Sequence, residues 1–362
     1  MATRSDVITD LRCHRLTARL HTPFVTALRS TTTVETTVVE VRTAAGLAGY
    51  GEAPQVWRVT GESLAGAEAC LSGPLRDVVV GRSADDLHDL LVDTSAAVVG
   101  NPGAKAAIDV ALHDLAAHRL GISLPRLLGT GRHRVATDMT ITAGGADQQG
   151  ADAAKRSAEG FAVLKLKVGT DAATDVARVQ AVRAAVGSEV AIRVDANQGW
   201  TVRQAIAVIR ALEDSGADLE FVEQPVAADD VDGLAAVTAA VDTPVMADES
   251  CFGLRDLTAI IERHAADLVN VKLAKCGGLR VARAMLELAT AHGVGTIVGS
   301  MMEGPIGVGA AASLVAAQPT TVTSDLDAAW WIASSPVIGG LSYDAGTVVL
   351  PDAPGLGIEG LA

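Results

Sequence analysis

From about residue 135 onward, short apolar runs alternate with longer Ala-rich stretches of helical periodicity. This alternation is typical of repeated βα units, whose strands form a parallel sheet. The candidate strands cover residues 136–142, 163–168, 190–195, 219–223, 245–248, 268–273, 296–301 and 322–326. Eight such units in succession favour a closed barrel, although the strand count alone leaves a doubly wound open sheet as an alternative.

The N-terminal part of the chain has a different pattern, which predicts an α+β unit. A Thr-rich stretch at residues 31–41 predicts a strand, and a short turn leads to a second strand at residues 47–51. Helical periodicity follows at residues 63–91 and again at residues 101–120. The two regions are joined without a low-complexity linker, so we expect them to pack closely together.

The length of 362 residues is enough for two domains. We expect an α+β domain at residues 1–130, a barrel at residues 131–330 and a C-terminal segment at residues 331–362 that returns to the first domain. Hydrophobic residues make up 49% of the chain but aromatic residues only 3%, so Ala, Val, Leu and Ile must form most of the core. Such a core suits helices packed on parallel strands.

The charge and the apolar segments limit the partners of the chain. A net charge of −14 argues against binding to nucleic acid or to an anionic membrane surface. The longest apolar stretches, such as residues 306–317, contain Gly and Ser and are too short to span a bilayer. Residues 1–9 contain no apolar segment of a secretory signal, and the four cysteines show no CxxC spacing. We therefore expect a cytoplasmic protein with reduced thiols.

Charged residues occur at or near the ends of five of the candidate strands. They are Lys167, Asp195, Glu223, Asp248 and Lys272, separated in turn by 28, 28, 25 and 24 residues. Each interval is about one βα unit, so the five side chains should meet at the same end of the barrel. That end, formed by the carboxyl ends of the strands, is where barrel enzymes carry their chemistry.

These residue types indicate proton transfer next to a carboxylate. Asp195, Glu223 and Asp248 offer an all-oxygen set that suits Mg²⁺, with Mn²⁺ as an alternative ion. Lys167 and Lys272 lie on either side of this set and can address opposite faces of one carbon. A lysine has an ordinary pKa of about 10.4, so a base of this type needs a lowered pKa. Burial or a positive neighbour, either the metal ion or the supporting lysines Lys165 and Lys275, could lower it.

At these positions the sequence resembles the enolase superfamily, in the branch that contains muconate-lactonising enzymes and dipeptide epimerases. The matching motifs are Lys165-Leu166-Lys167-Val168-Gly169, Asp195-Ala196-Asn197-Gln198-Gly199-Trp200, Val222-Glu223-Gln224-Pro225, Ala247-Asp248-Glu249-Ser250, Asn270-Val271-Lys272-Leu273 and Lys275-Cys276-Gly277-Gly278. The resemblance covers nearly the whole chain. It implies an α/β fold with an N-terminal α+β capping domain and a modified TIM barrel, (β/α)₇β. It also implies that the three acids bind the metal and that Lys167 and Lys272 are the acid and base.

Two further features are similar to dipeptide epimerases. Ser324-Asp325-Leu326-Asp327 resembles a motif whose two carboxylates receive the α-ammonium group of the substrate. Arg29, in a loop similar to that of epimerases acting on Ala-Glu, is expected to bind the Glu side chain, because arginine can bind a carboxylate in a bidentate manner. Thr140, Ser300 and Met302 are further candidates for the pocket wall. The resemblance thus implies an isomerase that moves the α-proton of the C-terminal residue of a dipeptide, with Ala-Glu preferred.

Other enzymes of the same superfamily are the alternatives. An acid-sugar dehydratase or a mandelate-racemase-like enzyme should carry a histidine on a late strand, and none of the eight histidines is placed there. A cycloisomerase or an o-succinylbenzoate-synthase-like lyase uses the same lysines and acids and remains the alternative. Asp325 and Asp327 argue against it, because they would repel a diacid. A catalytically silent barrel is disfavoured by the complete set of acids and lysines. A homo-oligomer is expected from the resemblance.

Overall fold

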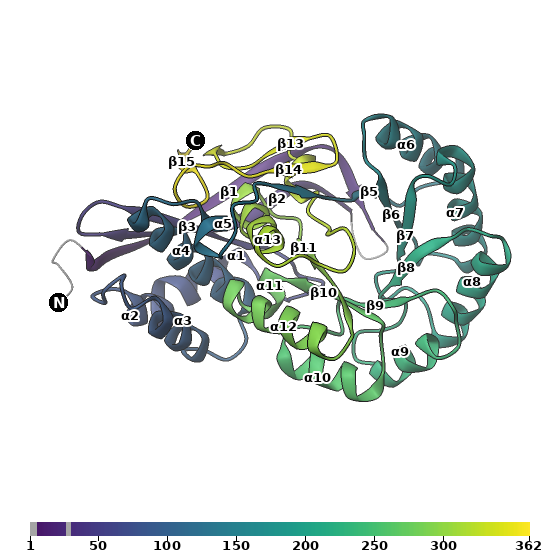
Figure 1. The fold of residues 1–362 in the computed structure, drawn as a ribbon, viewed down its shortest axis with the longest axis horizontal. Helices are drawn as coiled ribbons and strands as arrows, with labels where there is room; N and C mark the ends of the chain where they lie inside the picture. The colour runs from purple at the N-terminus through teal and green to yellow at the C-terminus, as the bar shows by residue number, and fades with distance from the viewer. Residues whose placement is uncertain (1–5, 27–29) are drawn as a thin grey trace.

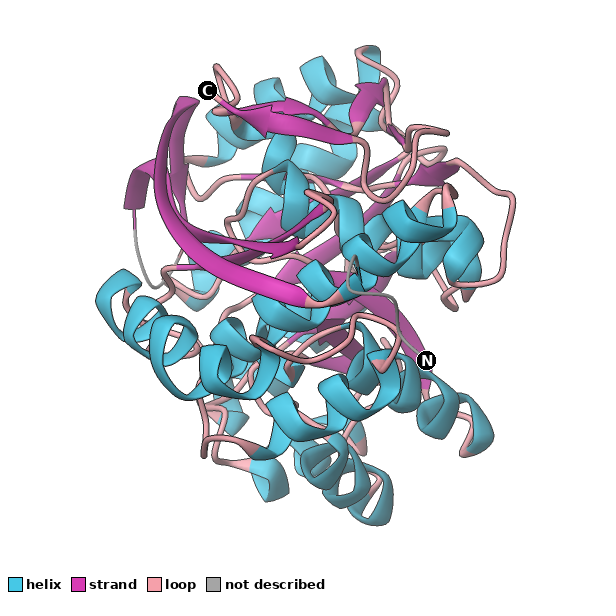
Figure 2. Cartoon of the chain, turned by 90° about the vertical axis from the view of Figure 1, so that its left-hand side faces the viewer, coloured by secondary structure: helices cyan, strands magenta, loops and turns pink. Residues whose placement is uncertain are grey.

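The computed structural model describes residues 6–26 and 30–362. The N-terminal region contains a three-stranded antiparallel sheet in the order β1-β2-β3. Its strands are β1 (Ile8–Val25), β2 (Ser30–Thr43) and β3 (Ala48–Pro54). Both strands predicted in this region are confirmed, and each is longer in the structure than the apolar pattern indicated. Figure 2 shows the strong curvature of these long strands.

The helices of the N-terminal region pack against this sheet. They are α1 (Leu64–Cys70), α2 (Arg76–Val79), α3 (Leu87–Ala96), α4 (Pro102–Leu120) and α5 (Leu124–Leu127). The helical periodicity at residues 63–91 corresponds to three helices, because a π-helical turn containing Pro74 and the non-helical Gly73 separates α1 from α2, and α3 begins only at Leu87. Helix α4 lies so close to β3 that a methyl group at Gly51 would be 1.8 Å from the carbonyl oxygen of Ala107.

The second region is a curved parallel sheet in the order β11-β10-β9-β8-β7-β6-β5. Its strands are β5 (Met139–Ile141), β6 (Val163–Lys167), β7 (Ala191–Asp195), β8 (Leu219–Glu223), β9 (Val245–Ala247), β10 (Leu268–Lys272) and β11 (Gly295–Gly299). The covering helices are α6 (Ala146–Ala158), α7 (Ala172–Val186), α8 (Val202–Asp214), α9 (Val231–Thr238), α10 (Leu254–Arg263), α11 (Leu273–Cys276), α12 (Leu279–Ala291) and α13 (Pro305–Ala317). Helices α6 to α10 form an outer arc around the strands in Figure 1. The predicted α/β barrel is confirmed.

The barrel closes through single bridges where an eighth strand was predicted. Asp325 bridges Gly299 of β11, and Ser324 bridges Thr137, just before β5. The predicted strands 136–142 and 322–326 are therefore wrong in extent. A side chain replaces part of the backbone ladder here, because the Thr137 hydroxyl accepts a hydrogen bond from the Leu326 N–H at 2.9 Å. Residues before Thr137 leave the barrel as β4 (Arg134–Ala136), which pairs with β14 (Thr347–Val349).

The C-terminal residues run back along the N-terminal region, next to β1 in Figure 1. They contain the 3₁₀ turn Ala328–Trp331 and the strands β12 (Val337–Gly339), β13 (Ser342–Asp344), β14 and β15 (Ile358–Leu361). The Ala333 N–H donates to the Arg19 carbonyl oxygen at 2.9 Å. The Leu356 N–H donates to the Asp114 carboxylate at 2.6 Å. On these contacts we propose a division into a capping domain, residues 1–130, a barrel, residues 131–330, and a returning segment, residues 331–362.

The capping domain also contacts the barrel through a buried carboxylate. Glu52 at the end of β3 accepts hydrogen bonds from the N–H groups of Gly304 at 2.6 Å and Gly307 at 2.9 Å. These groups lie at the N-terminus of α13, where unpaired N–H donors and the helix dipole favour a negative charge. Among the described residues, no helix is long and apolar enough to cross a membrane.

Candidate active site

The carboxyl ends of the central strands bring the predicted acids and lysines together. Lys167, Asp195, Glu223 and Lys272 are the last residues of β6, β7, β8 and β10, and Asp248 directly follows β9. Lys167 pairs in register with Asp195, and Asp195 with Glu223. All five side chains are buried. The one-unit spacing in the sequence therefore corresponds to neighbouring positions around the barrel mouth.

A pocket lies at this mouth, between the barrel and the capping domain. Of the charged residues predicted from the sequence, it is lined by Lys165, Lys167, Lys272, Asp248, Asp325 and Asp327. Thr140, Ser300 and Met302 also line it. The barrel adds Asn197 and Glu249, which lie in the matching motifs, and also Met301 and Ala328. The capping domain adds Phe24, Thr26, Val56, Arg58 and Val59. None of these residues was predicted as a site residue from the sequence. Arg29 lies outside the described residues.

The lysines are held by ion pairs to the predicted metal ligands. Lys167 Nζ lies 2.5 Å from Asp195 Oδ2, and Lys272 Nζ lies 2.8 Å from Asp248 Oδ2. Lys275 Nζ lies 2.5 Å from the other Asp248 oxygen, Oδ1, and donates to the Asn270 carbonyl oxygen at 3.0 Å. The lysines thus lie against Asp195 and Asp248, and despite burial Lys272 and Lys275 lower the pKa of Asp248.

The acids in turn control the protonation of Lys272. Burial alone would lower the pKa of Lys272, but Asp248 and Glu223 raise it above its ordinary value. This direction is opposite to the one expected from the sequence. Lys272 can become a neutral base only when another cation takes up the charge of those carboxylates.

Of the three predicted metal ligands, Glu223 offers an unused oxygen to such a cation. Glu223 Oε2 is buried and accepts no hydrogen bond, and Lys165 Nζ is 3.5 Å away from it. Asn197 Oδ1 and Glu249 Oε2 are also buried and accept no hydrogen bond. The remaining polar atoms of these two side chains are paired, because Asn197 Nδ2 donates to Glu249 Oε1 at 3.2 Å. Buried acceptors without donors are rare in folded proteins and are satisfied by ions or water. Oxygen donors alone suit a hard divalent cation, so the residues present fit Mg²⁺.

The same crowding perturbs the neighbouring carboxyl groups. Burial, followed by the repulsion of Asp248 and Asp195, raises the pKa of Glu249 to about 8. The pKa of Glu223 is also raised, by burial and by the charges of Asp195 and Asp248, although Lys165 acts in the opposite direction. Both shifts report an excess of negative charge that the lysines do not fully balance.

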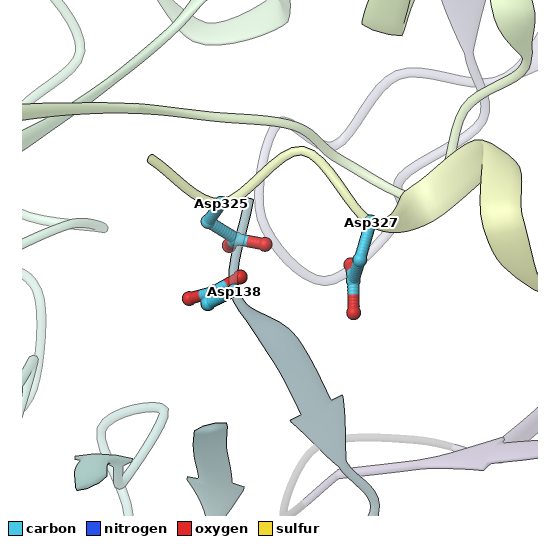
Figure 3. Close-up of side chains that lie close together, drawn as sticks. All are labelled: Asp138, Asp325 and Asp327. Carbon is cyan, nitrogen blue, oxygen red and sulfur yellow. The ribbon is translucent and has the colours of Figure 1, made fainter. Parts of the chain in front are cut away.

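A second acidic group forms where the barrel closes. Asp138, Asp325 and Asp327 each offer a carboxylate oxygen within 4.8 Å of the others, and Figure 3 shows the three side chains. Among the described residues, the predicted metal ligands Asp195, Glu223 and Asp248 do not form such a close group of carboxylate oxygens. Asp138 was missed in the sequence, where its signal was a lone acid between Thr137 and Met139 in an apolar strand.

Protein cations already balance two of these three acids. Lys165 pairs with Asp325, and Arg193 Nη1 lies 3.1 Å from Asp138 Oδ2 in a fully buried pair. Despite burial, Lys165 lowers the pKa of Asp325. Burial and the Asp325 charge raise the pKa of Asp327, which pairs with no cation in the described part of the chain. Asp327 is thus the acid of this group that has no paired protein cation among the described residues, which suits a ligand with an ammonium group.

Comparison with known proteins places the chain in a family. Residues 8–129 match the N-terminal domain of the mandelate racemase and muconate lactonizing enzyme family, and residues 149–360 match the enolase C-terminal domain-like family. The chain belongs to the enolase superfamily. Within this superfamily it is 40% identical over 356 residues to the L-Ala-D/L-Glu epimerase of Bacillus subtilis, covering 98% of this chain and 97% of that protein.

Solved structures of enolase superfamily members agree with this similarity. A substrate-liganded complex of the Bacillus subtilis epimerase has a TM-score of 0.95 at 40% identity, covering 98% of this chain and 99% of that one. The dipeptide epimerase of Enterococcus faecalis, complexed with Mg and L-Leu-L-Tyr, has a TM-score of 0.93 at 36% identity, covering 97% and 99%. The relatives therefore share a reaction type and differ in the dipeptide named for each.

Proposed function

We propose that this protein is a metal-dependent dipeptide epimerase that inverts the α-carbon of the C-terminal residue, with L-Ala-L-Glu and L-Ala-D-Glu as its substrate pair. The observation that carries the proposal is the placement of Lys167 and Lys272. They end strands β6 and β10, which have three strands between them on one side. On the other side lie β11, the bridging residues 324–325 and β5. The two lysines thus stand on opposite sides of one pocket.

This placement supports proton transfer on two faces of a bound carbon. One lysine, in its neutral form, removes the α-proton, and the protonated lysine on the other side delivers a proton to the opposite face. A proton delivered to the face opposite the one that lost it inverts the centre. General acid and base groups of this kind each contribute about 10²- to 10⁴-fold to rate.

Asp195, Glu223 and Asp248 are proposed to hold Mg²⁺, with Mn²⁺ as an alternative ion. When bound, the ion would stabilise the negative charge that develops on the substrate carboxylate as the α-proton leaves. Lys165 and Lys275 are proposed as supporting residues, because each forms a buried ion pair with an acid of the site. Their charges keep Asp325 and Asp248 in place and ionised.

Asp325 and Asp327 are proposed to bind the α-ammonium group of the dipeptide. The unbalanced charge of Asp327 supports this assignment, and charge-assisted hydrogen bonds make such recognition strong. The same charge would repel the diacid substrates of the cycloisomerase and lyase alternatives. The preference for Ala-Glu is supported by the 40% identity to the Bacillus subtilis enzyme. The roles of Arg29, Thr140, Ser300 and Met302 in binding the substrate, the cytoplasmic location and the homo-oligomer stay predictions.

The test is α-proton exchange in D₂O, followed by NMR, with Mg²⁺ and a library of L,L-dipeptides. Exchange at the second residue that is greatest for L-Ala-L-Glu and stops with EDTA is expected. If another dipeptide exchanges best, the reaction stands and the Ala-Glu preference is wrong. If none exchanges, the epimerase proposal is wrong, and lactone and succinylbenzoate substrates should be tested.

A further inference from the structure

The carboxylate of Asp327 is held from one side by two N–H donors. Its Oδ2 atom accepts hydrogen bonds from the Thr140 backbone N–H at 2.8 Å and from the indole Nε1–H of Trp331 at 3.1 Å. The other oxygen, Oδ1, accepts no hydrogen bond from the described residues, and Asp327 lines the pocket. The two donors therefore fix which oxygen is left for a ligand.

Trp331 also contacts the capping domain. Its ring meets the ring of Phe24 edge-on, with centroids 5.3 Å apart and an interplanar angle of 86°. Phe24 lies near the end of β1 and lines the pocket from the capping side. Both side chains are buried, so the contact excludes water. One indole thus contacts both the capping domain and a carboxylate of the barrel.

The neighbouring Trp330 provides a natural comparison. It packs against Trp331 with centroids 5.4 Å apart, and the Arg156 guanidinium lies 4.4 Å from its ring centroid. In the described part of the chain, its indole N–H donates to no carboxylate. The two adjacent tryptophans therefore pack against each other, but among the described residues it is Trp331 whose indole N–H donates to a carboxylate of the site.

We infer that Trp331 is a positioning residue for recognition of the substrate's amino terminus. Its N–H orients Asp327 so that Oδ1 faces the α-ammonium group, and its ring makes this orientation depend on the docked capping domain through Phe24. The inference rests on the proposed function, because it assigns a support to the ammonium site proposed there. This arrangement strengthens the binding of a dipeptide with a free amino group, whereas it does not strengthen the binding of a dipeptide blocked at that nitrogen.

The pH dependence of binding gives a readout that packing alone would not change. Burial and Asp325 raise the pKa of Asp327, while the bonds from Thr140 and Trp331 lower it. Lys165 also lowers it, and Asp138 and Tyr343 are the other titratable groups that face it. Loss of the indole donor should therefore raise the pKa further. Because the ammonium group needs an ionised carboxylate, kcat/KM should then fall at a higher pH on its acid side.

The experiment compares Trp331→Phe, which keeps an aromatic ring against Phe24, with the matched control Trp330→Phe. With L-Ala-L-Glu and saturating Mg²⁺, Trp331→Phe is expected to raise KM about tenfold, the effect of one hydrogen bond to a charged group. The kcat of this variant should stay within about twofold of the wild type. The pH at which its kcat/KM falls on the acid side should rise by about half a unit or more. The Ki of N-acetyl-L-Ala-L-Glu should not change, and Trp330→Phe should match the wild type.

A second measurement uses the wild-type protein, so that it does not depend on the folding of the variant. The chain has four tryptophans, and ¹⁵N NMR resolves their indole N–H groups. Single Trp→Phe substitutions at positions 57, 200 and 330 assign the remaining signal to Trp331. That signal should shift when L-Ala-L-Glu binds and should not shift with the N-acetylated dipeptide.

Specific results would overturn the inference. They are an unchanged KM in Trp331→Phe, an equal loss in both variants, an unmoved acid limb, or an indole signal that does not respond to the free dipeptide. An active wild type with any of these results overturns the inference alone. A wild type that exchanges no dipeptide overturns the proposed function and this inference with it.

Discussion

Replacing Lys272 with alanine should separate the two halves of the reaction. Inversion needs a proton acceptor on one face of the α-carbon and a donor on the other. Without Lys272, the protein keeps only Lys167, which stands on the opposite side of the pocket. We therefore expect the variant to exchange the α-proton of one epimer of Ala-Glu and to form almost none of the other. Lys167→Ala should show the reverse preference.

The size of the effect follows from the arrangement of the site. A lost general acid or base costs about 10²- to 10⁴-fold, so epimerisation should fall by that factor in both variants. Exchange of the epimer that faces the remaining lysine should stay within about tenfold of the wild type. Some loss is expected even there, because Lys272 pairs with Asp248 at 2.8 Å and its removal changes the charge of the site.

The assay follows loss of the α-proton signal in D₂O, with L-Ala-L-Glu and L-Ala-D-Glu in separate tubes. Lys155→Ala is the matched control, because Lys155 is an exposed lysine on α6. Thermal unfolding of each variant checks that the fold is kept. If Lys167→Ala and Lys272→Ala lose exchange with the same epimer, the two lysines do not serve opposite faces. Retained epimerisation in either variant would also contradict the two-lysine mechanism.

Three further predictions concern the metal, the ammonium site and the domain contact. EDTA should abolish exchange and added Mg²⁺ should restore it, while Asp195→Asn should need more Mg²⁺ for half-maximal activity; activity unaffected by EDTA would contradict this. Asp325→Asn should raise KM for L-Ala-L-Glu at least tenfold and leave the Ki of N-acetyl-L-Ala-L-Glu unchanged, because a charge-assisted bond to the ammonium group is lost. An equal weakening of binding for both compounds would contradict this expectation. Glu52→Gln should lower the free energy of unfolding by about 1–3 kcal/mol and Tm by several degrees, because the NH₂ group of the new glutamine faces an N–H donor at the start of α13. An unchanged Tm in calorimetry would contradict this expectation.

The acids and lysines of the barrel mouth were predictable because their positions follow from chain order. In parallel βα units, each strand ends at the same edge, so residues one unit apart become neighbours. Lys167, Asp195 and Glu223 illustrate this, since they are partners in adjacent strands. No contact between distant segments has to be known in advance. The confirmed barrel follows from the same periodicity.

The residues that were missed depend on contacts between distant segments. Asp138 is paired with Arg193, which is 55 positions away, and neither residue lies at a strand end that the spacing marked. Trp331 meets Phe24 only because the C-terminal residues return to the capping domain. The break in the predicted first strand also depends on a distant segment, because the Thr137 hydroxyl accepts a hydrogen bond from the N–H of Leu326, 189 positions away. Periodicity predicts elements, but not which of their side chains replace backbone pairing.

The most direct test of the central claim is the isotopic content of the product epimer. Wild-type protein with Mg²⁺ is incubated with L-Ala-L-Glu in D₂O, and the L-Ala-D-Glu formed is separated and analysed by mass spectrometry and NMR. The product is expected to carry one carbon-bound deuterium, at the α-carbon of Glu, because the proton that Lys167 or Lys272 delivers there comes from solvent. Product that keeps the original proton, or deuterium at the Ala residue, would contradict the two-lysine mechanism, and the absence of any epimer would contradict the proposed function.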